Sequence, residues 1–314
     1  MNYRLAAVAA MATLVGVAIC ANAMPFDDLP YAKPADINGA LFSTASREAG
    51  NILPDVSGSS AADNARLKFV ESAPFNTAAN AKWGPLMRDI VNHSPGEADE
   101  FSQYDLSTNA HEKIHGINSY ICKNSVGKCN YWAGSTGLYF GAGKAVLLPN
   151  PPMKRSQVRP FVPASLHGRR YKLYLLEQEH WEEYPLHILN EWSAYYFGAA
   201  VAVEAAELGI WANGKAGQSG PVEFFVYSLA AGMALKANAP EYYAGNPQFR
   251  ECLRLMGERT MKVYPLVARY PEFNWDHGDD SMYSALRNSP DAAPLRAYAR
   301  EVFGPEWTAS ALGF

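Results

Sequence analysis

The chain has 314 residues, of which 48% are hydrophobic and 18% are charged, and its formal net charge is -4. This composition is typical of a globular protein and excludes an intrinsically disordered one. No basic tract occurs in the sequence, so nucleic acid is not expected as a partner.

The first 23 residues have the three parts of a secretory signal peptide. Arg4 supplies a positive charge, residues 5–20 form an apolar run, and Ala21-Asn22-Ala23 has the small residues of a cleavage site. The alternative is a membrane anchor, but the run is short for a span, which needs about 20 apolar residues. We therefore predict cleavage after Ala23, a secreted or periplasmic location and no membrane span in the mature chain.

The mature chain is predicted to be mainly α with a small β element, an α+β fold. Residues 24–63 are rich in Pro, Asp, Asn, Ser and Gly and predict a loop-rich arm, followed by a single, mostly helical domain over residues 64–314. Apolar periodicity and prolines at first-turn positions predict helices over residues 81–93, 100–122, 169–183, 185–211, 221–238, 247–270 and 293–303.

Two segments interrupt the helical pattern. Residues 137–149 combine aromatic and β-branched residues around a glycine-containing turn, which predicts a β-hairpin. Its second half, residues 143–149, is either a plain structural strand or a strand that pairs with an extended substrate. Residues 149–163 contain several prolines and predict a surface loop.

The mature chain keeps three cysteines. The turn-rich stretch between Cys122 and Cys129 allows the chain to close a small loop, so we predict a disulfide between them in an exported protein. Cys252 is then unpaired and is expected to be a buried thiol on a helix. The alternative is that all three are buried free thiols.

The motif His111-Glu112-Lys113-Ile114-His115 is the strongest functional signal. Ser107, Thr108 and Asn109 just before it are candidate helix N-caps. On a helix, His111 and His115 share one face and can reach one zinc ion, while Glu112 points about 100° away, where a general base must sit. The alternative is an ordinary helix that carries two histidines.

A catalytic zinc needs a third protein ligand. Tyr184, His187, Glu191 and Tyr195 have the spacing of one helix face. Glu191 stands in an apolar context, where a carboxylate is costly to bury unless it binds a metal or pairs with a basic residue.

His187 could replace Glu191 as the ligand and leave Glu191 as its partner, and Glu183 and His180 are further rivals. Ordinary core packing is the competing interpretation for Tyr184, His187 and Tyr195.

The motif followed by a helix that contains Asn190-Glu191 resembles the gluzincin metallopeptidases. The spacing from Tyr184 to Glu191 resembles the anthrax lethal factor-like peptidases and the secreted Pro-Pro endopeptidases. This resemblance, limited to residues 108–120 and 184–198, implies a zincin-like architecture, zinc held by His111, His115 and Glu191, and Glu112 as the base. It also implies that Tyr184 steadies the oxyanion of the tetrahedral intermediate.

We therefore expect an exported zinc metallopeptidase that cleaves a peptide or protein substrate. His187 is a second candidate for stabilising the oxyanion. One alternative is a non-catalytic exported helical domain that binds a protein or a cell-envelope polymer. Another is a metal-dependent hydrolase that acts on a different bond.

Overall fold

The computed structural model describes residues 67–76, 82–95, 105–125, 134–211, 219–267, 269–270 and 279–314. These residues belong to one unit, Ala45–Phe314. The predicted signal peptide, the loop-rich arm and Cys129 lie outside the described residues, so the predictions for them remain predictions.

Three antiparallel strands form the sheet, in the order β1-β3-β2. They are β1 (Val70–Glu71), β2 (Ser135–Gly141) and β3 (Lys144–Pro149). β2 and β3 form the predicted hairpin, and its turn uses positive φ angles of 49° at Ala142 and 71° at Gly143. β3 pairs with β2 along its length but with β1 only at Lys144 and Ala145, so substrate pairing by the rest of β3 stays a prediction, and β2 is an edge strand of the sheet.

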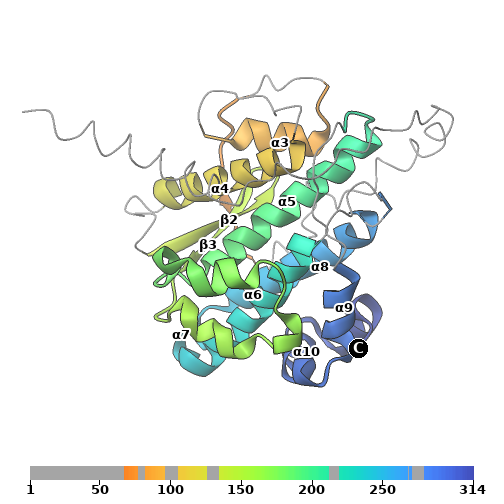
Figure 1. Cartoon of the computed structure of the whole chain (residues 1–314). Helices are drawn as coiled ribbons and strands as arrows, with labels where there is room; N and C mark the ends of the chain where they lie inside the picture. The colour runs from red at the N-terminus through yellow and green to blue at the C-terminus, as the bar shows by residue number, and fades with distance from the viewer. Residues whose placement is uncertain are drawn as a thin grey trace, which may run out of the picture. The chain divides into compact units, whose positions relative to one another are not determined.

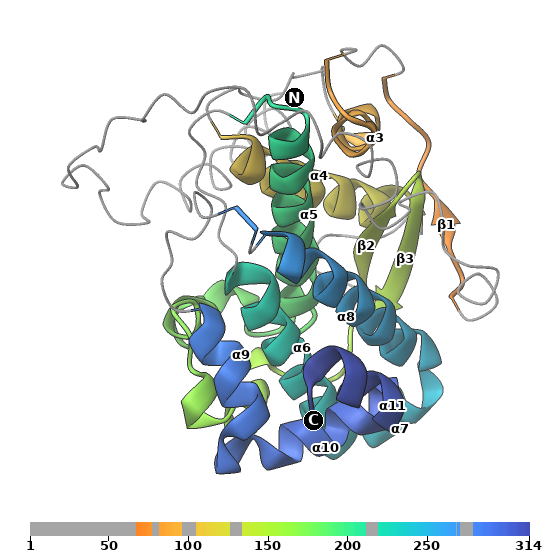
Figure 2. The same cartoon turned by 90° about the vertical axis from the view of Figure 1, so that its right-hand side faces the viewer.

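The described chain is mainly helical, as predicted. Its α-helices are α3 (Pro85–His93), α4 (Leu106–Ser125), α5 (His187–Glu207), α6 (Ser219–Asn238), α7 (Pro240–Gly245), α8 (Pro247–Val267), α9 (Asp279–Asn288), α10 (Ala293–Phe303) and α11 (Pro305–Trp307). The sequence pattern did not predict α7, α9 or α11. Figure 1 shows α4 and β2 on one side of α5, and α6 and α10 on the other; Figure 2 shows the sheet beside α4 from a second direction.

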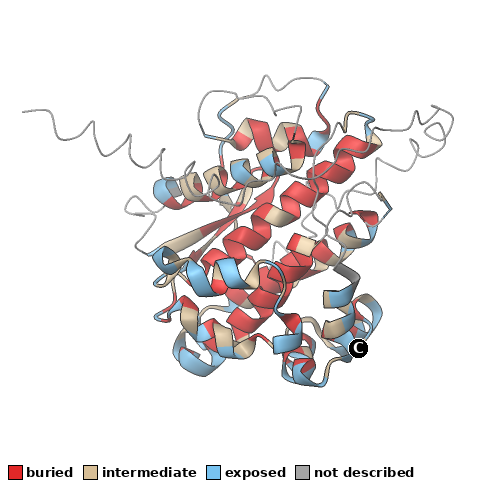
Figure 3. Cartoon of the chain, in the orientation of Figure 1, coloured by how far each residue is buried: buried red, intermediate tan, exposed pale blue. Residues whose placement is uncertain are grey.

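Helix α5 runs through the core. Almost all of its residues are buried, as Figure 3 shows. The helix itself carries alanine, glycine and aromatic residues on all of its faces, and a helix that is apolar all round is buried. Its side chains pack against α4, α6, α8 and β2. Trp192 and Phe197 are fully buried, and each such side chain stabilises the fold by about 1.5–3 kcal/mol. A rigid core helix therefore carries Glu191.

The segment before α5 differs from both predictions made for it. It contains the 3₁₀ turns η3 (Arg155–Phe161), η4 (Ala164–Leu166) and η6 (Glu179–Trp181) and the π-helical turn η5 (Lys172–Glu177). The predicted surface loop over 149–163 is wrong, because Arg155 and Val158 are buried. The predicted continuous helix over 169–183 is also wrong.

Tertiary hydrogen bonds explain why that helix does not form. The Arg155 guanidinium donates to the carbonyl of Tyr174, and Arg159 donates to the carbonyl of Leu175 at 2.5 Å. These carbonyls would otherwise accept bonds within a regular α-helix.

Two helix starts also differ from the sequence interpretation. Asp105 caps α4, because its Oδ1 accepts from the Thr108 backbone N–H at 2.9 Å. Ser107, Thr108 and Asn109 therefore belong to the first turn and are not the cap. Helix α5 begins at His187 rather than at the predicted residue 185.

Cys252 is free and buried in α8, as predicted. The bridge between Cys122 and Cys129 stays a prediction. None of the helices in the described part of the chain has the length and apolar character of a membrane span.

Candidate metal centre

Helices α4 and α5 bring His111, His115 and Glu191 together. The two histidines lie one turn apart on α4, and Glu191 lies in the second turn of α5. Gly198 on α5 permits this approach, because a Cβ there would lie only 2.9 Å from the Ser107 carbonyl oxygen and 3.7 Å from the His111 Cβ. The sequence therefore keeps the helices close enough for side chains of both to meet.

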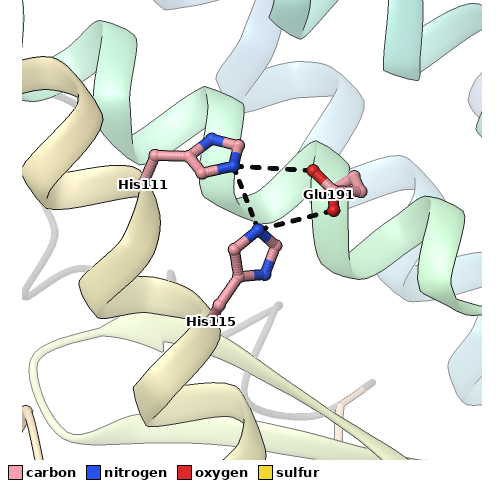
Figure 4. Close-up of side chains that lie close together, drawn as sticks. All are labelled: His111, His115 and Glu191. Carbon is pink, nitrogen blue, oxygen red and sulfur yellow. Dashed lines mark hydrogen bonds and ion pairs between the residues drawn. The ribbon is translucent and has the colours of Figure 1, made fainter. Parts of the chain in front are cut away.

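The three side chains point at a common centre, as Figure 4 shows. The Nε2 atoms of His111 and His115 are 3.0 Å apart. Glu191 Oε2 lies 3.5 Å from His111 Nε2, and Glu191 Oε1 lies 3.5 Å from His115 Nε2. Tetrahedral zinc with ligands at about 2.0–2.1 Å requires separations of about 3.3 Å between ligand atoms, so this spacing suits the ion.

Glu191 lacks part of the hydrogen bonding that its burial demands. The residue is 5% exposed, and its Oε2 is buried without a hydrogen-bond partner among the described residues. An ionised carboxylate in such a place is costly unless a cation or a donor compensates it. A metal ion bound by all three residues would supply that compensation.

The metal-free cluster holds an unusual distribution of protons. Burial and the neighbouring charge of His115 lower the pKa of His111 to about 3. Burial also disfavours protonated His115, but the charge of Glu191 outweighs it and raises the pKa of His115 to about 9. Burial would raise the pKa of Glu191, yet its contacts with His115 and His187 hold it well below the usual value. At neutral pH, two of the three groups are therefore already in their ligand form.

A chain of amides behind His115 sets its tautomer. The Tyr139 backbone N–H donates to Asn118 Oδ1 at 2.7 Å, so the Asn118 amide nitrogen faces Asn190 and donates to Asn190 Oδ1 at 2.9 Å. That oxygen is an acceptor and lies 2.9 Å from His115 Nδ1, which must carry the hydrogen in the neutral ring. Once His115 gives up its second proton, its Nε2 lone pair points toward Glu191 and is available to a metal.

His187 contacts Glu191 rather than the shared centre. Its Nε2 lies 3.1 Å from Glu191 Oε1, and its ring stacks on Trp181 with centroids 3.7 Å apart. It is not one of the three residues whose ligand atoms converge. His187 is thus placed to orient the Glu191 carboxylate.

The other sequence rivals for the third ligand are exposed. Glu183 pairs with Lys154 at 3.0 Å, and the ring of His180 lies beside Trp181. The structure brings neither of them into the cluster.

Tyr184 does not share a helix face with Glu191, which corrects the sequence interpretation. It lies in the turn before α5, because the helix begins three residues later. Its half-buried side chain lines a pocket that adjoins His187 and Asn190. Tyr184 therefore lines a pocket beside the cluster and does not lie on the α5 face that carries Glu191.

Glu112 lies on α4 between the two histidines and is exposed. It is not part of the converging group, but its charge contributes to the raised pKa of His115. An exposed carboxylate next to the cluster stays accessible to water, as a general base requires.

Tyr174, Tyr195 and Arg170 flank the cluster on the His111 side. The Tyr195 ring meets the His111 ring edge-on with centroids 4.4 Å apart, and the hydroxyls of Tyr195 and Tyr174 are 3.3 Å apart. The Arg170 guanidinium lies over the Tyr195 ring at 4.7 Å and donates to Glu223 Oε2 at 2.7 Å.

Sequence reasoning identified only part of this surrounding layer. Tyr195 lies four residues after Glu191 and so shares its helix face, and Asn190 directly precedes Glu191. Both residues therefore carried a local signal in the sequence. Asn118 lies three residues after His115 on the same helix, which was a weaker signal. Tyr174 and Arg170 lie in the irregular segment and carried none.

No protein-family model matches this chain, and comparisons with curated proteins and with solved structures also found no match.

Proposed function

We propose that the protein is a zinc-dependent peptidase of the gluzincin type with a zincin-like architecture. The observation that carries this proposal is the convergence of His111 Nε2, His115 Nε2 and the Glu191 carboxylate at separations suited to one tetrahedral ion. The resemblance of the motif and of the Asn190-Glu191 pair to gluzincins supports the same function.

Two nitrogens and one carboxylate are the donor set of many catalytic zinc sites, and three protein ligands leave a fourth position open. A bound zinc ion polarises a carbonyl group and makes water a better nucleophile at neutral pH. His111 and His115 are 13% and 19% exposed at their side chains, so a substrate can approach the cluster from solvent.

The chain's own groups then handle the proton. Glu112 would accept a proton from the attacking water and deliver it to the leaving amine, a role worth about 10²–10⁴-fold in rate. Asn190 keeps the hydrogen of His115 on Nδ1, and His187 steadies Glu191. Glu112, Asn190 and His187 thus act on the water, on His115 and on Glu191, respectively.

A small pocket beside the cluster joins the segment before α5 to the strand β2. Trp181 and Tyr184 form one wall, and Ser135, Thr136 and Gly137 of β2 form another. Backbone groups two residues apart in a strand face the same edge, so Gly137 presents its backbone on the edge where Tyr139 donates to an α4 side chain. Helix α4 already contacts this edge on either side of Gly137, because Asn118 accepts from the Tyr139 N–H and Cys122 Sγ lies 2.9 Å from the Ser135 carbonyl oxygen. A bound peptide could therefore add hydrogen bonds here only at Gly137.

Export belongs to the same proposal. A secreted or periplasmic peptidase would act on peptides or proteins outside the cytoplasm, and the predicted signal peptide supports that location.

The test uses Glu112→Gln, which keeps the shape of the side chain and removes the base. A peptide that the wild type cleaves is first selected from a peptide library. We expect the zinc content of the variant to stay near one per chain while its rate of cleavage of that peptide falls by at least about a hundredfold. Glu241→Gln, at an exposed glutamate in the first turn of α7, is the matched control and should behave as wild type. Undiminished cleavage by Glu112→Gln would remove Glu112 from the mechanism, and a chain that binds no zinc would favour the non-catalytic alternative.

A further inference from the structure

The π-helical turn η5 places Tyr174 beside the metal-binding face of α5. His187, Glu191 and Tyr195 follow one another at four-residue steps and so share one face of α5. The Tyr174 hydroxyl lies 3.3 Å from that of Tyr195, and the Tyr174 ring lies 6.4 Å from the His187 ring between centroids. Tyr174 thus contacts or approaches the residues one turn before and one turn after Glu191.

Backbone hydrogen bonds hold this turn in place. Arg155 is fully buried and donates to the Tyr174 carbonyl, while Arg159 donates to the carbonyls of Leu175 at 2.5 Å and Leu176 at 3.3 Å. Burying a guanidinium is costly unless its interactions compensate for the lost water. Two arginines thus bind three successive carbonyls of this turn, and single π-helical turns often occur at functional sites.

Arg155 also connects Tyr174 to the pocket. Its Nη2 lies 3.6 Å from Glu182 Oε2, and its backbone N–H donates to the Glu182 carbonyl at 2.8 Å. Glu182 lies between Trp181 and Tyr184, which form a wall of the pocket. The same buried arginine therefore positions Tyr174 and that wall relative to each other.

Tyr174 and Tyr184 occupy different places around the cluster. Tyr184 lines the pocket near Asn190, on the His115 side, whereas Tyr174 pairs with Tyr195, whose ring lies against His111. The Tyr174 side chain is only partly buried.

We propose that Tyr174, rather than Tyr184, donates the hydrogen bond that stabilises the oxyanion during cleavage, and that Tyr195 is the positioning residue that orients its hydroxyl. This inference rests on the proposed peptidase function. A preorganised donor held by a rigid backbone stabilises developing negative charge without reorganising at the moment of reaction. Tyr184 contributes to substrate binding in the pocket.

The variant Tyr174→Phe tests this role, because it removes the hydroxyl and keeps the ring that meets Phe224 edge-on at 4.9 Å. With the zinc-loaded full chain and a peptide that the wild type cleaves, we expect kcat to fall about 10²–10³-fold. KM should stay within about threefold, since the lost bond forms only in the transition state. Affinity for a phosphinate analogue of the same peptide should fall by a factor similar to that of kcat, while zinc content and thermal midpoint stay at wild-type values.

Two tyrosine variants serve as comparisons. Tyr171→Phe removes a hydroxyl near the start of the same segment, where the ring stacks on His167 at 3.6 Å, and should keep wild-type kinetics. Tyr184→Phe should change KM more than kcat, because that side chain lines the pocket.

The possible failures are distinguishable. Wild-type kcat in Tyr174→Phe would overturn the assignment of Tyr174 and leave the peptidase function standing. Loss of zinc or of cooperative unfolding in this variant would also overturn the assignment, because Tyr174 would then have a structural role. A wild-type chain that binds zinc but cleaves no peptide would refute the peptidase function and the Tyr174 role together.

Discussion

Replacing Asn190 with alanine perturbs the layer behind His115 without touching a ligand. Asn190 is 7% exposed, and its Oδ1 lies 2.9 Å from His115 Nδ1 and accepts from Asn118 Nδ2 at 2.9 Å. Losing such a support typically weakens metal binding by about 10–100-fold, which is about 1.4–2.7 kcal/mol. The Asn118 amide also loses an acceptor in a buried place, which should lower the free energy of unfolding of the metal-free protein by about 1–3 kcal/mol.

Competition with a chromophoric chelator measures the zinc affinity of Asn190→Ala, and urea unfolding measures its metal-free stability. Asn190→Asp keeps an acceptor for His115 and should retain more zinc affinity than the alanine variant. Asn124→Ala is the matched control, because Asn124 is exposed on the same helix as His115 and donates to the Tyr120 carbonyl. Wild-type zinc affinity in Asn190→Ala would refute the role of this amide in orienting His115.

Four further outcomes test the ligands, the proton balance and the buried thiol. Glu191→Ala should lose zinc on dialysis against a chelator and His187→Ala should keep most of it, measured as zinc per chain; the reverse result would indicate a three-histidine site. Zinc binding at about pH 7.5 should release about one proton, measured calorimetrically in buffers of different ionisation enthalpy, because the metal-free pKa of His115 is about 9. Since that pKa is raised from 6.5, the associated stabilisation of the metal-free fold is complete below about pH 6.5 and is lost as the pH rises through about 9, and a flat stability profile over this range would contradict the assignment. Burial raises the pKa of Cys252, so native protein should resist alkylation that unfolded protein undergoes, and rapid labelling of the native chain would contradict its burial.

The grouping of His111, His115 and Glu191 was predictable because each residue carries a local signal. Two histidines four apart on a helix share a face whatever surrounds them, and a lone carboxylate in an apolar helix needs a compensating partner. The predominance of helices and the hairpin were predictable for a similar reason, since both follow from short-range periodicity and turn residues.

The irregular segment before α5 was not predictable in this way. Its residues have helical spacing, but Arg155 and Arg159 take the carbonyls that a helix would use, and a tertiary contact of this kind leaves no mark on local periodicity. The prediction for the position of Tyr184 was wrong for a related reason. It assumed helical spacing from Tyr184 to Glu191, but the helix begins only at His187. The positions of Tyr174 and Arg170 depend on the same segment.

Anomalous diffraction at the zinc edge from crystals of the zinc-loaded protein would locate the ion itself. We expect one peak about 2.0–2.2 Å from His111 Nε2, from His115 Nε2 and from a carboxylate oxygen of Glu191. A peak bound by His187 in place of Glu191, or no peak between α4 and α5 in a folded chain, would contradict the proposed zinc site.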